Sequence, residues 1–271
     1  MSNLRADASA TIPTRVLARG PVVRAVIAPV AFGVVMLLAW QLLVDGLDIA
    51  PFVLPSPTDI GAQFAQNLDS VAAGAARTGL NALIGLVIGA VLGVLGAIVA
   101  NLVAVLDEMA APLVAALSVM PIVALAPVLY TMYGADTETA RQIVAGLAVV
   151  IPVYLNTLRG LRQVDPVHRD LMRAHAASAW QQQRLVTLPT ALPYVFTGLR
   201  IASSLAVISA LVAEYFGGPV SGLGKSITSA AASSNYPLAW AYVLGAIVLG
   251  LMFYGVTLGL ESWITRHTRP I

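Results

Sequence analysis

The sequence consists of long apolar blocks separated by short polar stretches. A helix that spans a membrane needs roughly 20 mainly apolar residues. Six blocks approach or exceed that length, the fourth with help from its neighbours: Ala25–Val44, Asn81–Leu106, Pro112–Tyr133, Ile143–Leu158, Tyr194–Phe216 and Leu238–Ile264. Strands of a membrane barrel would alternate apolar and polar residues, whereas these blocks are apolar on every side. The pattern predicts an all-α integral membrane protein with about six transmembrane helices.

Composition leads to the same class. The 271 residues are 58% apolar and only 10% charged, whereas a soluble domain carries about a quarter charged residues. This excludes a soluble enzyme and a disordered chain. A net charge of only +2 gives no basic patch, so nucleic acid is excluded as a partner. The absence of cysteine excludes disulfides, thiolate metal sites and cysteine nucleophiles.

The distribution of basic residues predicts the orientation. If the N-terminus is cytoplasmic, only Arg77, Arg141 and Lys225 of the 15 basic residues fall outside. The others fall on the cytoplasmic side, as the positive-inside rule requires: Arg5, Arg15, Arg19, Arg24, Arg159, Arg162, Arg169, Arg173, Arg184, Arg200, Arg266 and Arg269. Both termini are therefore expected in the cytoplasm of a multi-pass protein.

The chain divides into a transmembrane domain with two tails. Residues 1–24 form a polar leader, expected to be a disordered cytoplasmic tail, and residues 265–271 form a second cytoplasmic tail. The first apolar block lacks a clear small-x-small cleavage site, which favours an uncleaved anchor over a signal peptide. Residues 25–264 are the transmembrane domain. After the first span, Thr58 or Asp59 is expected to cap a short helix on the outer membrane surface.

The longest cytoplasmic connection runs over residues 159–193. Asp165 and Pro166 favour a helix start, because proline suits the first helical turn. The small residues Ala174–Ala179 would allow another protein to approach the backbone, and Pro189 and Pro193 are expected to end the helical segment. Composition alone leaves two interpretations open: a surface for a partner, or a basic loop that only sets the orientation.

Glycine and proline mark special positions within the spans. Gly85, Gly89 and Gly93 repeat every fourth residue, a spacing that lets transmembrane helices approach closely, either inside one subunit or between subunits. Proline interrupts the third apolar block at Pro121 and Pro127 and the fourth at Pro152. Broken helices can line a transport path, although proline is common in membrane helices generally.

Candidate chemistry is sparse. Gly222–Ser226 resembles the end of a phosphate-binding loop, but the first glycine of that motif is replaced by Pro219, so no ATP site is expected. The acidic residues are scattered: Asp136 and Glu138 are assigned to an exterior loop, and Glu214 and Glu261 lie near helix ends. The three histidines, His168, His175 and His267, lack the spacing of metal ligands. No catalytic residue and no metal site are predicted.

The 159–193 connection and its flanks resemble the signature of bacterial ABC-importer permeases, in which an acidic residue and two alanines precede a glycine and a Leu-Pro pair. Aligned on Leu188-Pro189, the acidic position falls on Asp170, the alanines on Leu171-Met172 and the glycine on Ala176. Further matches are Leu54-Pro55-Ser56-Pro57, Pro121 with Leu125-Ala126-Pro127, Ala213-Glu214 and Gly222-Leu223-Gly224. These marks resemble the nitrate, taurine and aliphatic-sulfonate branch.

The resemblance implies a type I ABC-importer permease in the bacterial inner membrane. Two permease copies, expected to be a homodimer, would form the path for a small anionic or heterocyclic solute delivered by an extracytoplasmic substrate-binding protein. Two cytoplasmic ATPase subunits would bind ATP and magnesium, while this chain would bind no cofactor and contact only these proteins and membrane lipid. The helix around Asp170–Trp180 would enter a cleft on the ATPase. The implied contact residues are Asp170, Arg173, Ala174, His175, Ala176, Ala177, Ser178, Trp180, Leu188 and Pro189.

The transport path is expected near Pro121, Pro127 and Glu214. The alternative function is a secondary transporter or channel with six helices, which needs ionisable residues inside its spans, for which Arg200 and Glu214 are the candidates. A purely structural membrane subunit is a third class. Co-purification with an ATPase would separate the importer from both.

Overall fold

The computed structural model describes residues 20–134, 136–219 and 221–268, and within these ranges the regular structure is helical throughout. Five helices are long and apolar enough to cross a membrane: α1 (Gly20–Gly46), α3 (Leu68–Leu102), α6 (Thr139–Arg162), α9 (Leu188–Phe216) and α11 (Tyr236–Thr268). A bent pair, α4 (Ala104–Val119) with α5 (Ala126–Tyr133), gives a sixth span if counted as one. The prediction of an all-α protein with about six spans is confirmed.

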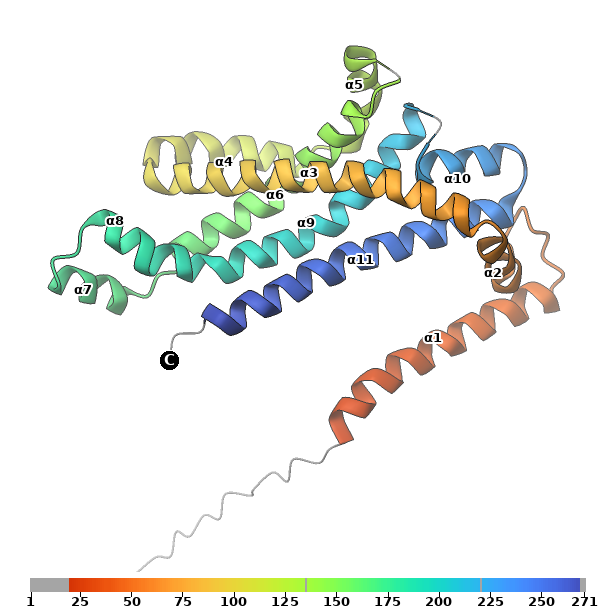
Figure 1. Cartoon of the computed structure of the whole chain (residues 1–271), viewed down its shortest axis with the longest axis horizontal. Helices are drawn as coiled ribbons and strands as arrows, with labels where there is room; N and C mark the ends of the chain where they lie inside the picture. Colours follow the sequence, from red (N-terminus) through yellow and green to blue (C-terminus); the bar gives the residue numbers. More distant parts are fainter. Residues whose placement is uncertain (1–19, 135, 220, 269–271) are drawn as a thin grey trace, which may run out of the picture.

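The centre of the bundle is built from α3, α6 and α9, and α11 packs against α9 (Figure 1). Its core is made largely of small residues, among them Ala82, Ala145, Ala202, Ala206 and Ala210. Small side chains let the helix backbones approach closely. The outward faces of α3 and α11 carry exposed leucine, valine and isoleucine, as expected for surfaces that meet lipid or another apolar chain.

The first helix lies apart from this bundle. Figure 1 shows α1 meeting the remainder of the chain only at its C-terminal end, near α2 (Pro57–Gln66). There, the rings of Trp40 and Trp240 meet edge to face with centroids 5.8 Å apart, and the Thr58 amide donates to Gln41. The helix begins at Gly20, five residues before the predicted tail boundary, and residues 1–19 lie outside the described residues.

The third predicted span differs most from expectation. Instead of one interrupted helix over Pro112–Tyr133, α4 starts at Ala104, and the chain turns by 85° between α4 and the segment Ile122–Tyr133. Met120 is extended at ψ 131°, the conformation favoured for a residue before proline, here Pro121. Pro127 lies in the first turn of α5, so only Pro121 marks the break. The short 3₁₀ turn η1 (Ile122–Leu125) follows the break and leads into α5.

The short helix predicted after the first span is present, but its cap is a different residue. Ser56, not Thr58 or Asp59, is the N-cap of α2, and its hydroxyl accepts a hydrogen bond from the Asp59 amide at 3.1 Å. Pro57 then occupies the first helical position, where its missing N–H costs nothing. The helix packs on α11 through a buried face that includes Ile60.

The two ends of the bundle are distinct. The short helices α7 (Pro166–Ala174) and α8 (Ala179–Gln182) lie at one end together with the C-terminal part of α11 (Figure 1). The helices α2 and α10 (Leu223–Ala232) lie at the opposite end. The last helix continues to Thr268, so residues 265–268 of the predicted tail are helical. The basic-residue count above predicts that the α7–α8 end is the cytoplasmic one.

Candidate functional site

The 159–193 connection begins with the predicted helix start. The Asp165 carboxylate caps α7 by accepting a hydrogen bond from the Val167 amide at 2.8 Å, and Pro166 takes the first helical position. The helix ends at Ala174, where the His175 amide donates to Leu171 O. The expected single helix over Asp170–Trp180 is therefore wrong: a turn separates α7 from α8.

Backbone geometry at Ala176 explains that turn. Ala176 has a φ of 49°, a left-handed conformation that suits glycine and costs other residues roughly 1–2 kcal/mol. Ser178 then starts α8 with a capping box, in which its hydroxyl accepts from the Gln181 amide and its amide donates to the Gln181 side chain. Ala176 is the residue aligned with the signature glycine, so the turn accounts for a glycine preference there.

The α7–α8 surface is exposed and partly apolar. The side chains of Val167, Leu171 and Trp180 are 71%, 53% and 68% exposed. Asp170 and Arg173 form an ion pair at 3.6 Å, but both are largely exposed, so the pair adds little stability. Exposed apolar residues that include a tryptophan are typical of protein–protein contact sites.

The helix α8 continues into the membrane without a break. It passes through a π turn, η2 (Gln183–Thr187), directly into α9, where Leu188 and Pro189 form the first turn. The expectation that Pro189 and Pro193 end the helical segment is wrong. In the π turn the Leu188 amide donates to Gln183 O, and this wider spacing accommodates a proline at position 189. The segments α8, η2 and α9 therefore form one continuous helix.

Two ion pairs connect this end of the bundle. Arg162, in the last turn of α6, pairs with Asp107 of α4 at 2.5 Å. Arg200 of α9 pairs with Glu261 of α11 at 3.0 Å, and one turn further along α9 the hydroxyl of Ser203 lies 3.2 Å from that of Thr257. Arg200 is thus held by a carboxylate of its own chain.

The repeated glycines lie where α3 crosses α6. A Cβ on Gly85 would come within 2.5 Å of the Ala145 Cβ, and one on Gly93 within 3.0 Å of the Val150 carbonyl oxygen. Gly89 is equally tight, with Gly146 O at 2.5 Å from its notional Cβ. The three positions therefore face a helix of the same subunit, which supports packing within the subunit.

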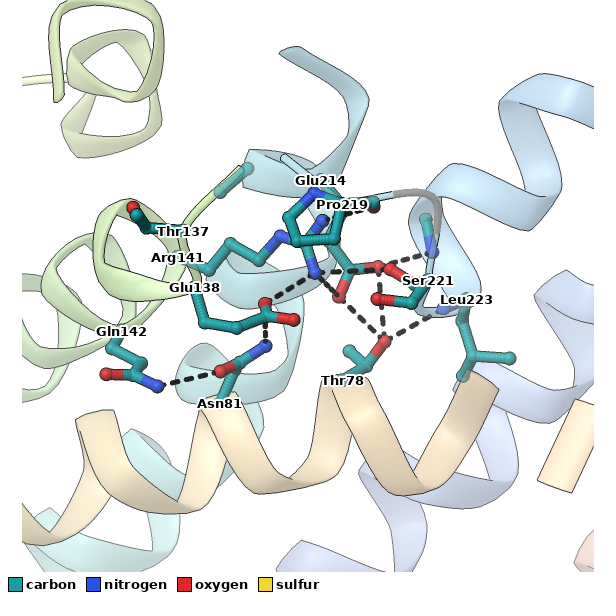
Figure 2. Close-up of polar contacts among 12 residues, drawn as sticks. Thr78, Asn81, Thr137, Glu138, Arg141, Gln142, Glu214, Pro219, Ser221 and Leu223 are labelled. Atoms are coloured by element: carbon teal, nitrogen blue, oxygen red, sulfur yellow. Dashed lines mark hydrogen bonds and ion pairs between the residues drawn. The ribbon is translucent and has the colours of Figure 1, made fainter. Parts of the chain in front are cut away.

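A buried polar cluster lies at the opposite end from α7–α8 (Figure 2). Arg141, fully buried in the first turn of α6, pairs with Glu138 at 2.6 Å and with Glu214 at 3.8 Å. Its guanidinium also donates to the carbonyls of Pro219 and Ser221 and to the Tyr130 hydroxyl. One arginine thus joins α5, α6, the end of α9 and the chain that leads to α10.

Thr78 and Asn81 of α3 complete the cluster. The Thr78 hydroxyl donates to Glu214 at 2.9 Å, and the Asn81 amide donates to Glu138 at 2.7 Å while its oxygen accepts from Gln142. A buried ion pair of this kind depends on complete hydrogen bonding. Glu214, expected beside the path, is enclosed within the subunit, and Pro121 and Pro127 lie about the α4–α5 bend with exposed side chains.

Sequence reasoning missed most of this cluster. The sequence places Glu138 and Arg141 on the outer side of the membrane, but it does not predict that they form an i, i+3 pair at the start of α6 or that Arg141 is wholly buried. Thr78 and Asn81 also lie three apart on one face of an apolar helix, and that spacing of polar residues was the available signal. Within the described part of the chain, no group of three or more His, Asp or Glu side chains could hold a metal ion.

Comparison with known proteins gives one consistent result. Residues 85–269 match the sequence profile of the family described as binding-protein-dependent transport system inner membrane component. The riboflavin transport system permease protein RibX of Chloroflexus aurantiacus is 31% identical over 151 residues, which are 56% of each chain. The putative aliphatic sulfonates transport permease protein SsuC of Bacillus subtilis is 29% identical over 219 residues, covering 80% of this chain and 78% of SsuC.

A solved structure has the same fold. A crystal structure of an amino acid ABC transporter with histidines superimposes with a TM-score of 0.60 at 15% identity, covering 73% of this chain and 95% of that chain. This likeness concerns the arrangement of helices alone.

Proposed function

Because the chain belongs to the family of binding-protein-dependent transport system inner membrane components, we propose that it is the membrane-spanning subunit of an ABC importer and couples solute passage to ATP hydrolysis by a separate ATPase. Proteins of this family are multi-pass components of the bacterial inner membrane. The chain itself performs no hydrolysis and holds neither ATP nor magnesium, which bind to the ATPase subunits.

The observation that carries the coupling role is the continuity of α8 with α9. The exposed side chain of Trp180 lies on α8, and α8 joins α9 through η2. If a partner bound to Trp180 changed position, it would displace α8 and α9 together as one rigid helix. The ion pair between Arg200 and Glu261 would transmit that displacement to α11. Rigid-body motion of this kind can switch a bundle between two states.

The partners follow from the same assignment. Two copies of the chain enclose the path, two ATPase subunits bind at the α7–α8 end, and a substrate-binding protein docks at the α2–α10 end. The two relatives are named as a riboflavin transport system permease and a putative aliphatic sulfonates transport permease, which supports a small heterocyclic or anionic solute. Arg200 and Glu214, the residues that an ion-coupled transporter would need, are both engaged in internal ion pairs, so no second function is proposed.

The experiment begins with the tagged full-length chain, purified from its native membrane with its ATPase and binding protein. Mass spectrometry of the binding protein identifies its ligand, and proteoliposomes that contain the complex should accumulate that ligand only when ATP is supplied. Trp180→Ala should release the ATPase during purification. Phe52→Ala, at the other end and also 68% exposed, should leave the ATPase bound. Accumulation without ATP would overturn the proposal.

A further inference from the structure

The segment Gly222–Ser226 resembles a phosphate-binding loop, yet its backbone amides are already occupied. The Leu223 amide donates to the Thr78 hydroxyl at 2.9 Å (Figure 2). The Gly224 amide donates to a Glu214 carboxylate oxygen at 2.7 Å. In a phosphate-binding loop these donors would hold the anion at the helix N-terminus. Here a carboxylate of the same chain takes that position, so no external anion can bind to them.

The lysine of this segment lies against a separate pocket. The pocket has a volume of about 380 Å³, between α10 and the start of α11, and it is lined by Lys225, Ser226, Ser229, Ala230, Ser233, Leu238 and Tyr242. A volume in the lower part of the usual range for ligand sites suits a small molecule. No acidic residue lines it, and Lys225 forms no ion pair with any carboxylate among the described residues.

Three hydrogen-bond donors in this pocket have no partner in the described chain. Ser226 and Ser233 donate their hydroxyl protons to backbone carbonyls. The Lys225 ammonium and the hydroxyls of Ser229 and Tyr242 make no hydrogen bond within the described residues. One cation and two hydroxyl donors without an acidic neighbour form a site for a single negative charge, since donors paired with an ionised acceptor form the stronger hydrogen bonds.

We propose that this pocket binds a small monoanion with a sulfonate, carboxylate or similar oxyanion group. Lys225 pairs with the charge, Ser229 and Tyr242 donate hydrogen bonds to the oxygens, and Ala230 and Leu238 contact an organic substituent. The oxyanion can belong to a free solute or to an anionic lipid headgroup, since both carry this chemistry. The inference rests on the pocket alone and does not require the chain to drive import.

Binding of trifluoromethanesulfonate provides a direct test. The full-length chain is placed in nanodiscs of phosphatidylcholine, and binding is measured by ¹⁹F NMR saturation transfer, with methanesulfonate as the competitor. Lys225→Gln should weaken binding by about tenfold or more, because a hydrogen bond to a charged group is lost, while Lys225→Arg should retain it. Arg77→Gln is the matched control, since Arg77 is an exposed cation on α3 that does not line the pocket.

Phosphatidylglycerol in the nanodiscs distinguishes the two sources. If it weakens probe binding to the wild-type chain, the pocket takes a lipid headgroup, and if it has no effect, the pocket takes a free anion. Both outcomes support the anion site. Equal binding by the wild-type chain and Lys225→Gln would overturn the proposal, as would equal weakening by Arg77→Gln, which would indicate attraction to surface charge in general. Because no ATPase is present, failure here is separate from failure of transport.

Discussion

Gly89 provides a sensitive test of how closely α3 and α6 approach. A Cβ at this position would lie 2.5 Å from Gly146 O and 2.8 Å from the Val149 Cβ. Non-bonded carbon atoms prefer separations of about 3.5–4.0 Å, so Gly89→Ala must push the helices apart by roughly 0.7–1 Å. Overpacking of this kind costs about 1–3 kcal/mol, and the better helix propensity of alanine returns at most about 1 kcal/mol. We therefore expect Gly89→Ala to be destabilising.

The matched control lies two turns further along the same helix. A Cβ on Gly96 would meet the Tyr154 ring at 3.5 Å, an ordinary contact, so Gly96→Ala should be neutral or stabilising. The assay heats each variant in detergent and measures the fraction that stays monodisperse by size-exclusion chromatography. Gly89→Ala should lose monodispersity several degrees below the wild type. If both variants melt with the wild type, the helices are not as close as the structure has them, and the packing role of Gly89 is wrong.

Three further predictions concern single interactions. Arg141→Met leaves the Glu138 and Glu214 carboxylates without their cation and should cost about 3–5 kcal/mol, so size-exclusion chromatography should recover little folded protein; normal yield would contradict the buried cluster. Ala176→Gly relieves the positive φ and should stabilise the turn by about 1 kcal/mol, seen as slower amide hydrogen exchange around residue 178, whereas Ala177→Gly should not. Arg200→Glu should lower the melting temperature by placing two carboxylates together, and Arg200→Glu with Glu261→Arg should restore much of it; no restoration would argue against the α9–α11 ion pair.

The sequence predicted the parts of this fold that depend on periodicity. Apolar length located the spans, and the four-residue spacing of Gly85, Gly89 and Gly93 indicated the close helix contact. The buried cluster escaped prediction because Glu138 and Arg141 lie at the boundary between a loop and α6, where polar residues are common in either setting. The cluster forms only because the fold brings Thr78 and Glu214, which are 136 residues apart in the sequence, into hydrogen-bond contact in the interior of the bundle.

Proline was the least reliable guide to helix ends. Pro121 marks a sharp bend, whereas Pro152 lies within a continuous α6 and Pro189 within the first turn of α9. The difference lies in the surrounding backbone: an extended residue precedes Pro121, and a π turn precedes Pro189. Neither the extended residue nor the π turn can be recognised from the amino-acid types in the sequence. The positive φ at Ala176 cannot be recognised from them either.

Crosslinking at Ser178 tests the central claim most directly. The chain contains no cysteine, so Ser178→Cys and Ser70→Cys each introduce one reactive group at an exposed position, the first on the α7–α8 turn and the second near the start of α3. In sealed cells, Ser178→Cys should resist an impermeant maleimide added outside and should crosslink to the ATPase after the membranes are opened, while Ser70→Cys should react from outside and form no such crosslink. Labelling of Ser178→Cys from outside, or its failure to crosslink in a complex that retains the ATPase, would contradict the proposed coupling role.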